Sequence, residues 1–70
     1  MKVIVYKTNI KNEYQKEMIA PVIGKIKGIT EWSIDFEDKD KVLRIEGYSL
    51  NPKHIEAVII KAGFECEILY

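Results

Sequence analysis

Apolar and polar residues alternate in two neighbouring stretches near the middle of the chain, at 29–37 and 41–48. A period of two is that of a strand with one buried and one solvated face. A continuous run of β-branched and aromatic residues predicts a central strand at 3–10, and a further alternating stretch predicts a last strand at 65–70. Asp38-Lys39-Asp40 is expected to form the turn between the two alternating strands. The residues predicted to face the core from the second and last strands are Trp32, Ile34, Phe36, Phe64, Cys66 and Ile68.

Apolar residues return at helical spacing in two other stretches, which predicts two helices with one buried stripe each. Asn12 and Gln15 have the spacing of a capping box at the start of the first helix. Asn51, followed by Pro52, has the pattern of a second helix start. Pro21 lacks a backbone N–H, so a kink is expected within the first helix. Gly28 and Gly63 are expected to end the helices, and the predicted stripes are Met18, Ile19, Val22, Ile23, Ile26 and Ile55, Val58, Ile59, Ala62.

The predicted order of elements is βαββαβ. Two helices with one apolar stripe each can cover one face of a four-stranded antiparallel sheet and leave the other face open. The fold class is therefore α+β, with the ferredoxin-like sandwich as the expected arrangement. With 70 residues, the chain has the length of one small domain, and we expect residues 1–70 to form a single domain.

Composition narrows the classes of function. Eleven basic and eleven acidic side chains cancel, which gives no electrostatic reason to expect binding to nucleic acid or to a membrane surface. A single cysteine, Cys66, excludes an internal disulfide and favours a reducing compartment, so a cytoplasmic location is expected. No stretch approaches the roughly 20 apolar residues of a membrane span. One histidine and one cysteine, placed far apart, make no catalytic dyad, and no phosphate-binding glycine loop is present, so an enzyme is not expected.

Several local patterns agree with one known family. Residues 29–36 have the spacing hydrophobic-x-x-hydrophobic-x-hydrophobic-Asp-hydrophobic, and residues 41–46 follow as the next strand. Residues 55–64 end in Lys-Ala-Gly-Phe, and residues 6–10 lead into the first helix with Ile10 in the last position. Over essentially its whole length the chain resembles the heavy-metal-associated domain, the module of small copper chaperones and of the N-terminal regions of metal-pumping ATPases. The resemblance implies the same βαββαβ fold.

The metal-binding motif of that family is Cys-x-x-Cys, and here Asn12 and Gln15 stand at its two cysteine positions. In the family, two thiolates at this spacing hold Cu(I) or supply half of a zinc site. Neutral amides are poor ligands for soft metals, but they can accept hydrogen bonds from the free N–H groups of a helix start. We therefore expect a degenerate metal site at Asn12 and Gln15 and no cofactor.

Four other side chains are candidates for a role at a metal site. Cys66 should lie at the same end as the Asn12 turn, and its parity places it on the buried face, where it is either a small core residue or a metal or redox residue. His54 should lie at the opposite end, on the surface. Met18 is expected in the core. Lys61 matches in position the basic residue near the metal loop of some copper chaperones, and without thiolates it is expected to be solvated.

These observations favour a small non-enzymatic binding or interaction module resembling heavy-metal-associated domains, with direct Cu(I) or Zn(II) binding not expected. The alternative is a divergent heavy-metal binding or trafficking protein that uses Cys66 in a dimer or the cysteines of a partner. A regulatory ligand-binding domain on the same topology is a third reading. A protein partner or a homodimer could form through the open sheet face, where Val3, Val5, Val42 and Leu69 are expected.

Overall fold

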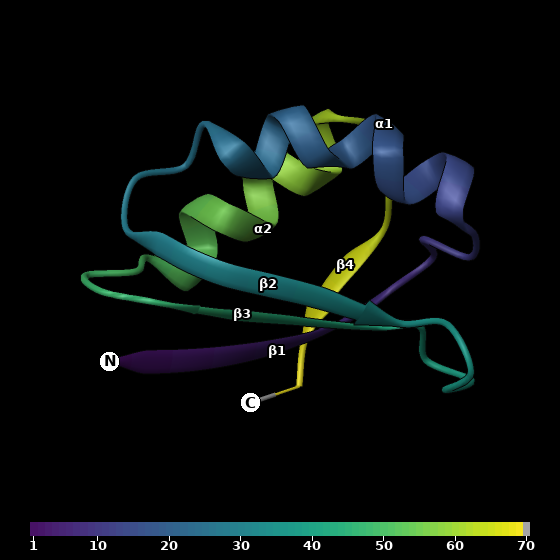
Figure 1. Cartoon of the computed structure of the whole chain (residues 1–70), viewed down its shortest axis with the longest axis horizontal. Helices are drawn as coiled ribbons and strands as arrows, with labels where there is room; N and C mark the ends of the chain where they lie inside the picture. Colours follow the sequence, from purple (N-terminus) through teal and green to yellow (C-terminus); the bar gives the residue numbers. More distant parts are fainter. Residues whose placement is uncertain (70) are drawn as a thin grey trace.

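The computed structural model describes residues 1–69 and has the predicted element order in that part of the chain (Figure 1). The strands form one antiparallel sheet in the order β2-β3-β1-β4, and both helices lie on the same face of it (Figure 1). This arrangement confirms the predicted ferredoxin-like α+β fold. The bounds are β1 Lys2–Thr8, α1 Glu13–Gly24, β2 Ile29–Asp35, β3 Val42–Gly47, α2 Pro52–Lys61 and β4 Cys66–Ile68.

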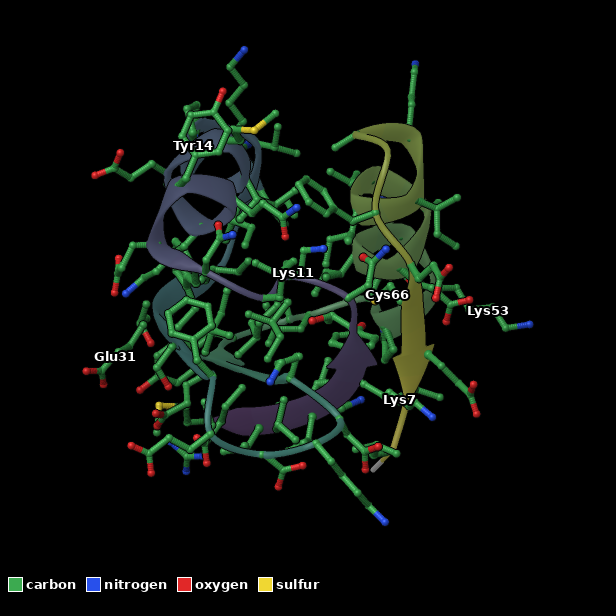
Figure 2. The ribbon with its side chains drawn as sticks, turned by 90° about the vertical axis from the view of Figure 1, so that its right-hand side faces the viewer. Lys7, Lys11, Tyr14, Glu31, Lys53 and Cys66 are labelled. Carbon is green, nitrogen blue, oxygen red and sulfur yellow. The ribbon has the colours of Figure 1, made fainter. Side chains whose placement is uncertain are left out.

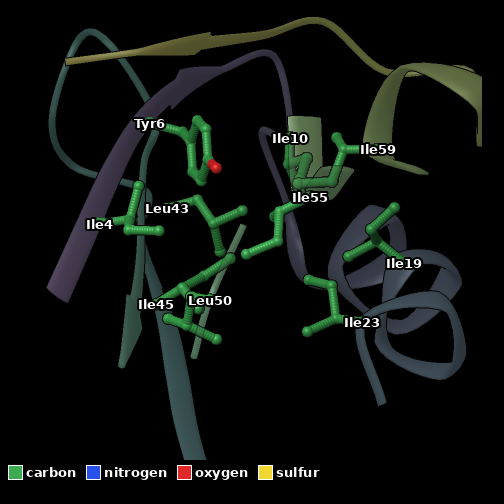
Figure 3. Packing of buried hydrophobic residues seen from close by; sticks show 10 residues of the cluster. All are labelled: Ile4, Tyr6, Ile10, Ile19, Ile23, Leu43, Ile45, Leu50, Ile55 and Ile59. Carbon is green, nitrogen blue, oxygen red and sulfur yellow. The ribbon is translucent and has the colours of Figure 1, made fainter. Parts of the chain in front are cut away.

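The core lies between the sheet and the two helices (Figure 3). β1 is a central strand, as its apolar run predicts, and its Ile4 and Tyr6 pair across the sheet with Ile45 and Leu43 of β3. Burying one large aliphatic side chain stabilises a fold by about 1.5–3 kcal/mol, so this layer dominates the stability of so small a chain. The helices contribute fully buried isoleucines to the same cluster: Ile19 and Ile23 from α1, and Ile55 and Ile59 from α2.

The first helix ends four residues earlier than predicted, at Gly24 instead of Gly28. The N–H of Lys25 donates to the carbonyls of Val22 and Ile23, which closes the last turn. Gly28 instead adopts a φ of +93° just before β2, and its carbonyl accepts the N–H of Tyr48 at 2.9 Å. A tertiary hydrogen bond therefore fixes Gly28 at the start of the sheet, outside the helix.

The predicted stripe of α1 is correct at its centre and wrong at its edge. Ile19 and Ile23 are fully buried, whereas Met18 is 52% exposed and does not lie in the core. A helix can press only part of an apolar stripe this wide against a sheet, and the packed face of α1 centres on the two isoleucines. Ala62 is likewise exposed, because it follows the last residue of α2 as its C-cap.

The strands are shorter than predicted. β1 ends at Thr8, whose N–H donates to the carbonyl of Asp40 at 3.0 Å while its hydroxyl donates to the carbonyl of Lys41 at 2.6 Å. These bonds turn the chain out of the sheet before Ile10. At the other end, β4 covers only Cys66–Ile68, and Tyr70 of the predicted strand lies outside the described residues.

Side chains on the core-facing side of β4 become more exposed along the strand, from the half-buried Cys66 to Ile68. Ile68 is 45% exposed although it shares a face with Cys66, because β4 is an edge strand with no neighbour on its outer side.

The open face of the sheet carries fewer exposed apolar side chains than expected. Val3 and Leu69 are exposed there, but Val5 is only 4% exposed. Val5 lies in a central strand directly opposite Arg44 of β3, and β4 flanks it on the other side. In the described part of the chain, neither helix has the length and apolar character needed to cross a membrane.

Candidate functional site

The turn between β1 and α1 is closed by two side-chain amides. Asn12 is the N-cap of α1, and its Oδ1 accepts the N–H of Gln15 at 2.9 Å. The Oε1 of Gln15 reaches back and accepts the N–H of Lys11 at 3.0 Å. The predicted capping pair is confirmed, with one difference: Gln15 bonds the residue before the cap and not the N–H of the cap itself. Both side-chain oxygens are thus used to satisfy backbone N–H groups.

The same turn is fixed to the core and to the start of β4 by Ile10 and Asn9. Ile10 is fully buried, and its N–H donates to the hydroxyl of Thr8 at 3.2 Å. Asn9 accepts the N–H of Glu65 on its Oδ1 at 2.8 Å, which ties the turn to the residue just before β4. The loop is therefore held by core packing and by hydrogen bonds to two parts of the chain.

Cys66 lies at this end of the molecule, as predicted (Figure 2). It pairs with Thr8 across β1 and β4, and its half-buried side chain packs against the core. Burial, and to a lesser extent the carboxylate of Glu56 on α2, together raise the pKa of the Cys66 thiol to about 12. The thiol is therefore protonated at neutral pH, and a protonated thiol is neither a good nucleophile nor a good metal ligand.

A buried phenol lies beside this thiol. The hydroxyl of Tyr6 donates to the carbonyl of Pro52 at 2.7 Å and so links the central strand to the first turn of α2. Burial, followed by the proximity of Cys66 and Glu56, raises the pKa of Tyr6. The sequence indicated only an apolar strand here, and the parity of Tyr6 with Ile4 was the one available signal that its ring is buried.

The other candidates stay apart from this turn. His54 lies in the first turn of α2, at the end of that helix remote from Gly63, and its side chain is exposed. Lys61 is exposed in the last turn of α2. Within residues 1–69, no three side chains of the types His, Cys, Asp or Glu come together as they would around a metal ion.

The acidic residues at the β2–β3 turn accept hydrogen bonds from backbone N–H groups of the turn itself. The Oδ1 of Asp38 accepts the N–H of Asp40 at 2.8 Å, and the Oδ1 of Asp35 accepts the N–H of Glu37 at 3.0 Å. Asp40 also approaches the ammonium group of Lys7 at 3.7 Å. These bonds agree with the turn expected at Asp38-Lys39-Asp40.

One feature of the surface was not anticipated from the sequence. A groove of about 680 Å³ runs between α1 and α2 and is lined by Pro21, Val22, Lys25, Ile26, Lys27, His54, Val58, Lys61 and Ala62. Its residues come from two segments far apart in the sequence, the end of α1 with the residues that follow it and α2 with its C-cap, so only the packed structure brings them together. The excess of lysine near the end of the first helix was the only local signal.

No family model and no curated protein matches the sequence. Solved structures do match in fold. The yeast copper transporter domain Ccc2a has a TM-score of 0.84 at 18% identity, covering 100% of this chain and 97% of that one. A copper-binding domain from HMA7, a P-type ATPase, also gives 0.84 at 18% identity, covering 100% and 96%. The N-terminal domain of PacS from Synechocystis PCC6803 gives 0.82 at 14% identity and covers both chains fully. The chain therefore has the fold of heavy-metal-associated domains.

Proposed function

We propose that this protein is a non-enzymatic binding or interaction module in which a capped helix start has replaced the metal-binding dithiol of the heavy-metal-associated fold. One observation carries the proposal: both amide oxygens at the two motif positions, Asn12 Oδ1 and Gln15 Oε1, accept backbone N–H groups at 2.9 and 3.0 Å. In metal-binding relatives the equivalent side chains would be thiolates directed at the ion. Here the turn meets its own hydrogen-bonding needs.

The remaining thiol does not substitute for the lost pair. Soft metals such as Cu(I) bind thiolate, and the pKa of Cys66 near 12 leaves almost none of it ionised at neutral pH. Binding would also have to release the proton and draw the sulfur away from its packing against the core. Direct Cu(I) or Zn(II) binding by one chain is therefore disfavoured. The likeness to copper transporter and copper-binding domains supports the fold alone.

The proposal extends to the setting in which the module acts. Residues 1–70 would form a single domain in the cytoplasm, without enzymatic activity of their own. A partner protein or a second copy would dock on the open sheet face, where Val3 and Leu69 are exposed. Neither nucleic acid nor a membrane is the expected partner of a chain with balanced charge.

A second function is favoured by the position of Cys66. The thiol is only half-buried, and it lines a small hollow of about 140 Å³ together with Lys7, Thr8, Glu65 and Glu67. A partner's cysteines, or Cys66 of a second copy, could complete a soft-metal site there. This alternative predicts metal-dependent association, because one chain supplies a single sulfur.

Competition for Cu(I) against a chelator of moderate affinity distinguishes the two functions. The proposal predicts that the reduced wild-type protein removes no Cu(I) from the chelator and sediments as the same species with and without metal. Stoichiometric Cu(I) binding that is abolished by Cys66→Ser would contradict it and establish the second function. Zn(II) titration under the same conditions extends the test to a harder ion.

A further inference from the structure

The groove between α1 and α2 is separate from the turn described above. The two helices pack against each other on one face of the sheet (Figures 1 and 2), and the groove follows the line between them. Its lining includes none of residues 9–15. A volume of about 680 Å³ is within the range of small-molecule sites in proteins. The groove is therefore a candidate ligand site that is independent of the degenerate metal loop.

The groove combines an apolar floor with basic groups along its sides. Val22, Ile26 and Val58 are partly buried, and Pro21 and Ala62 extend this apolar surface. Three lysines and one histidine lie around it, and no acidic residue contributes to the lining. The whole chain has no net charge, so this local excess of positive charge does not follow from composition. The four basic residues are Lys25, Lys27, His54 and Lys61.

The lysines of the groove have no carboxylate partners among the described residues. The ion pairs in residues 1–69 join Lys7 to Asp40 and Arg44 to Glu46, both outside the helical layer. Three lysines line an apolar surface that no acidic residue lines, and none of the three forms an ion pair within residues 1–69, so the groove presents a positive potential that attracts anions. The apolar floor adds a second requirement, because an anion without an apolar part would leave it in contact with water.

We propose that this groove binds a small amphipathic carboxylate, a molecule with a hydrocarbon body that lies on Val22, Ile26 and Val58. Its carboxylate would pair with the ammonium groups of Lys25 and Lys61. A lysine ammonium is a flexible point charge on a long stem, so Lys25, just after α1, and Lys61, at the end of α2, can close on a carboxylate from two sides. The lysine stems would cover the edges of the hydrocarbon body.

Binding of decanoate to the ¹⁵N-labelled wild-type protein tests the proposal. We expect saturable amide shifts centred on the groove lining, with binding of 1-decanol at least about tenfold weaker and no shifts with acetate at the same concentration. Lys25→Glu and Lys61→Glu should each weaken decanoate binding about fivefold, and the double variant more. Lys53→Glu is the matched control, since it makes the same charge change on an exposed residue of α2 outside the groove and should leave the affinity unchanged.

Several results would overturn the proposal: no saturable shift with decanoate, shifts centred on the sheet face, equal affinity for 1-decanol, or an equal loss in Lys53→Glu. Tighter binding of a hexaglutamate peptide than of decanoate would also overturn it, and would assign the groove to an acidic protein segment. Unfolding midpoints of the variants show whether each one is folded. Cu(I) competition tests the Asn12 turn, whereas decanoate binding tests the groove. A negative result with decanoate therefore leaves the proposed function intact, and Cu(I) binding by the wild type would leave the groove proposal intact.

Discussion

The hydrogen bond between Asn12 and the N–H of Gln15 should contribute measurably to stability if the turn is organised by its own side chains. Asn12→Ala removes the acceptor and leaves one of the four free N–H groups of the helix start to water. Replacing an N-cap asparagine by alanine costs about 0.5–2 kcal/mol, typically about 1 kcal/mol. The bond is exposed, so water compensates in part, and we expect a loss of about 1 kcal/mol.

A loss of this size corresponds to a fall of about 4–8 °C in Tm for a chain of this length. Gln15→Ala removes the second bond, to the N–H of Lys11, and should cost less, since alanine is the better helix former. The two bonds close the same turn, so the double variant should show a coupling free energy of about 0.5 kcal/mol. Asn12→Asp should preserve the cap and gain about 0.3–1 kcal/mol from a negative charge at the helix N-terminus.

Urea denaturation measures these differences, with an unchanged m value as the sign that only stability has altered. Lys39→Ala, in the exposed β2–β3 turn, is the control for a surface truncation and should change little. The reasoning is refuted if Asn12→Ala is as stable as wild type and Asn12→Asp is no more stable than Asn12→Ala.

Three further predictions concern interactions elsewhere in the fold. Tyr6→Phe removes the hydroxyl that donates to Pro52 and should lower the free energy of unfolding by about 1 kcal/mol in urea, with no loss if the bond is unimportant. Gly28→Ala places a Cβ 2.2 Å from the Tyr48 carbonyl oxygen at a φ of +93° and should cost more than about 2 kcal/mol, whereas Gly24→Ala, with no atom within 4 Å of its Cβ, should be neutral or stabilising by thermal unfolding. The pKa of Cys66 is raised from an ordinary value of about 9 to about 12 in the folded state, so the contribution of the buried thiol to stability is complete below about pH 9 and decreases as the pH rises towards 12. Stability measured from pH 7.5 to 9.5 should therefore fall in wild type more steeply than in Cys66→Ala, and equal slopes would contradict the placement of the thiol.

The starts of the helices could be predicted from the sequence because capping is local. Asn12 with Gln15, and Asn51 with Pro52, each satisfy the helix start within a few residues. Alternation also predicted correctly which face of β2 is buried. The end of α1 was missed because Gly24 and Gly28 are both plausible stops. The hydrogen bond from Tyr48 to Gly28, twenty residues along the chain, decides between them.

Two features of the surface depended on packing and could not be predicted. Met18 belongs to the apolar stripe of α1 by spacing, but the rotation of the helix on the sheet leaves it exposed. The groove between the helices is lined both by Lys25, just after α1, and by Lys61 of α2, and no spacing rule relates residues of two separate segments. At the turn itself, the chemistry could be predicted from residue identity, because an amide cannot supply a thiolate. The alternation along the last strand also predicted that Cys66 faces the core, and this burial raises the pKa of its thiol.

The central claim is that Asn12 and Gln15 occupy the two positions of a lost dithiol site. The affinity of the reduced Asn12→Cys/Gln15→Cys variant for Cu(I), measured in chelator competition beside the wild type, tests it most directly. The account predicts tight binding of one Cu(I) per chain by the variant, with Cys66→Ser in the same background causing no change, and none by the wild type. Wild-type binding as tight as that of the variant, or a variant that fails to bind while remaining folded, would contradict it.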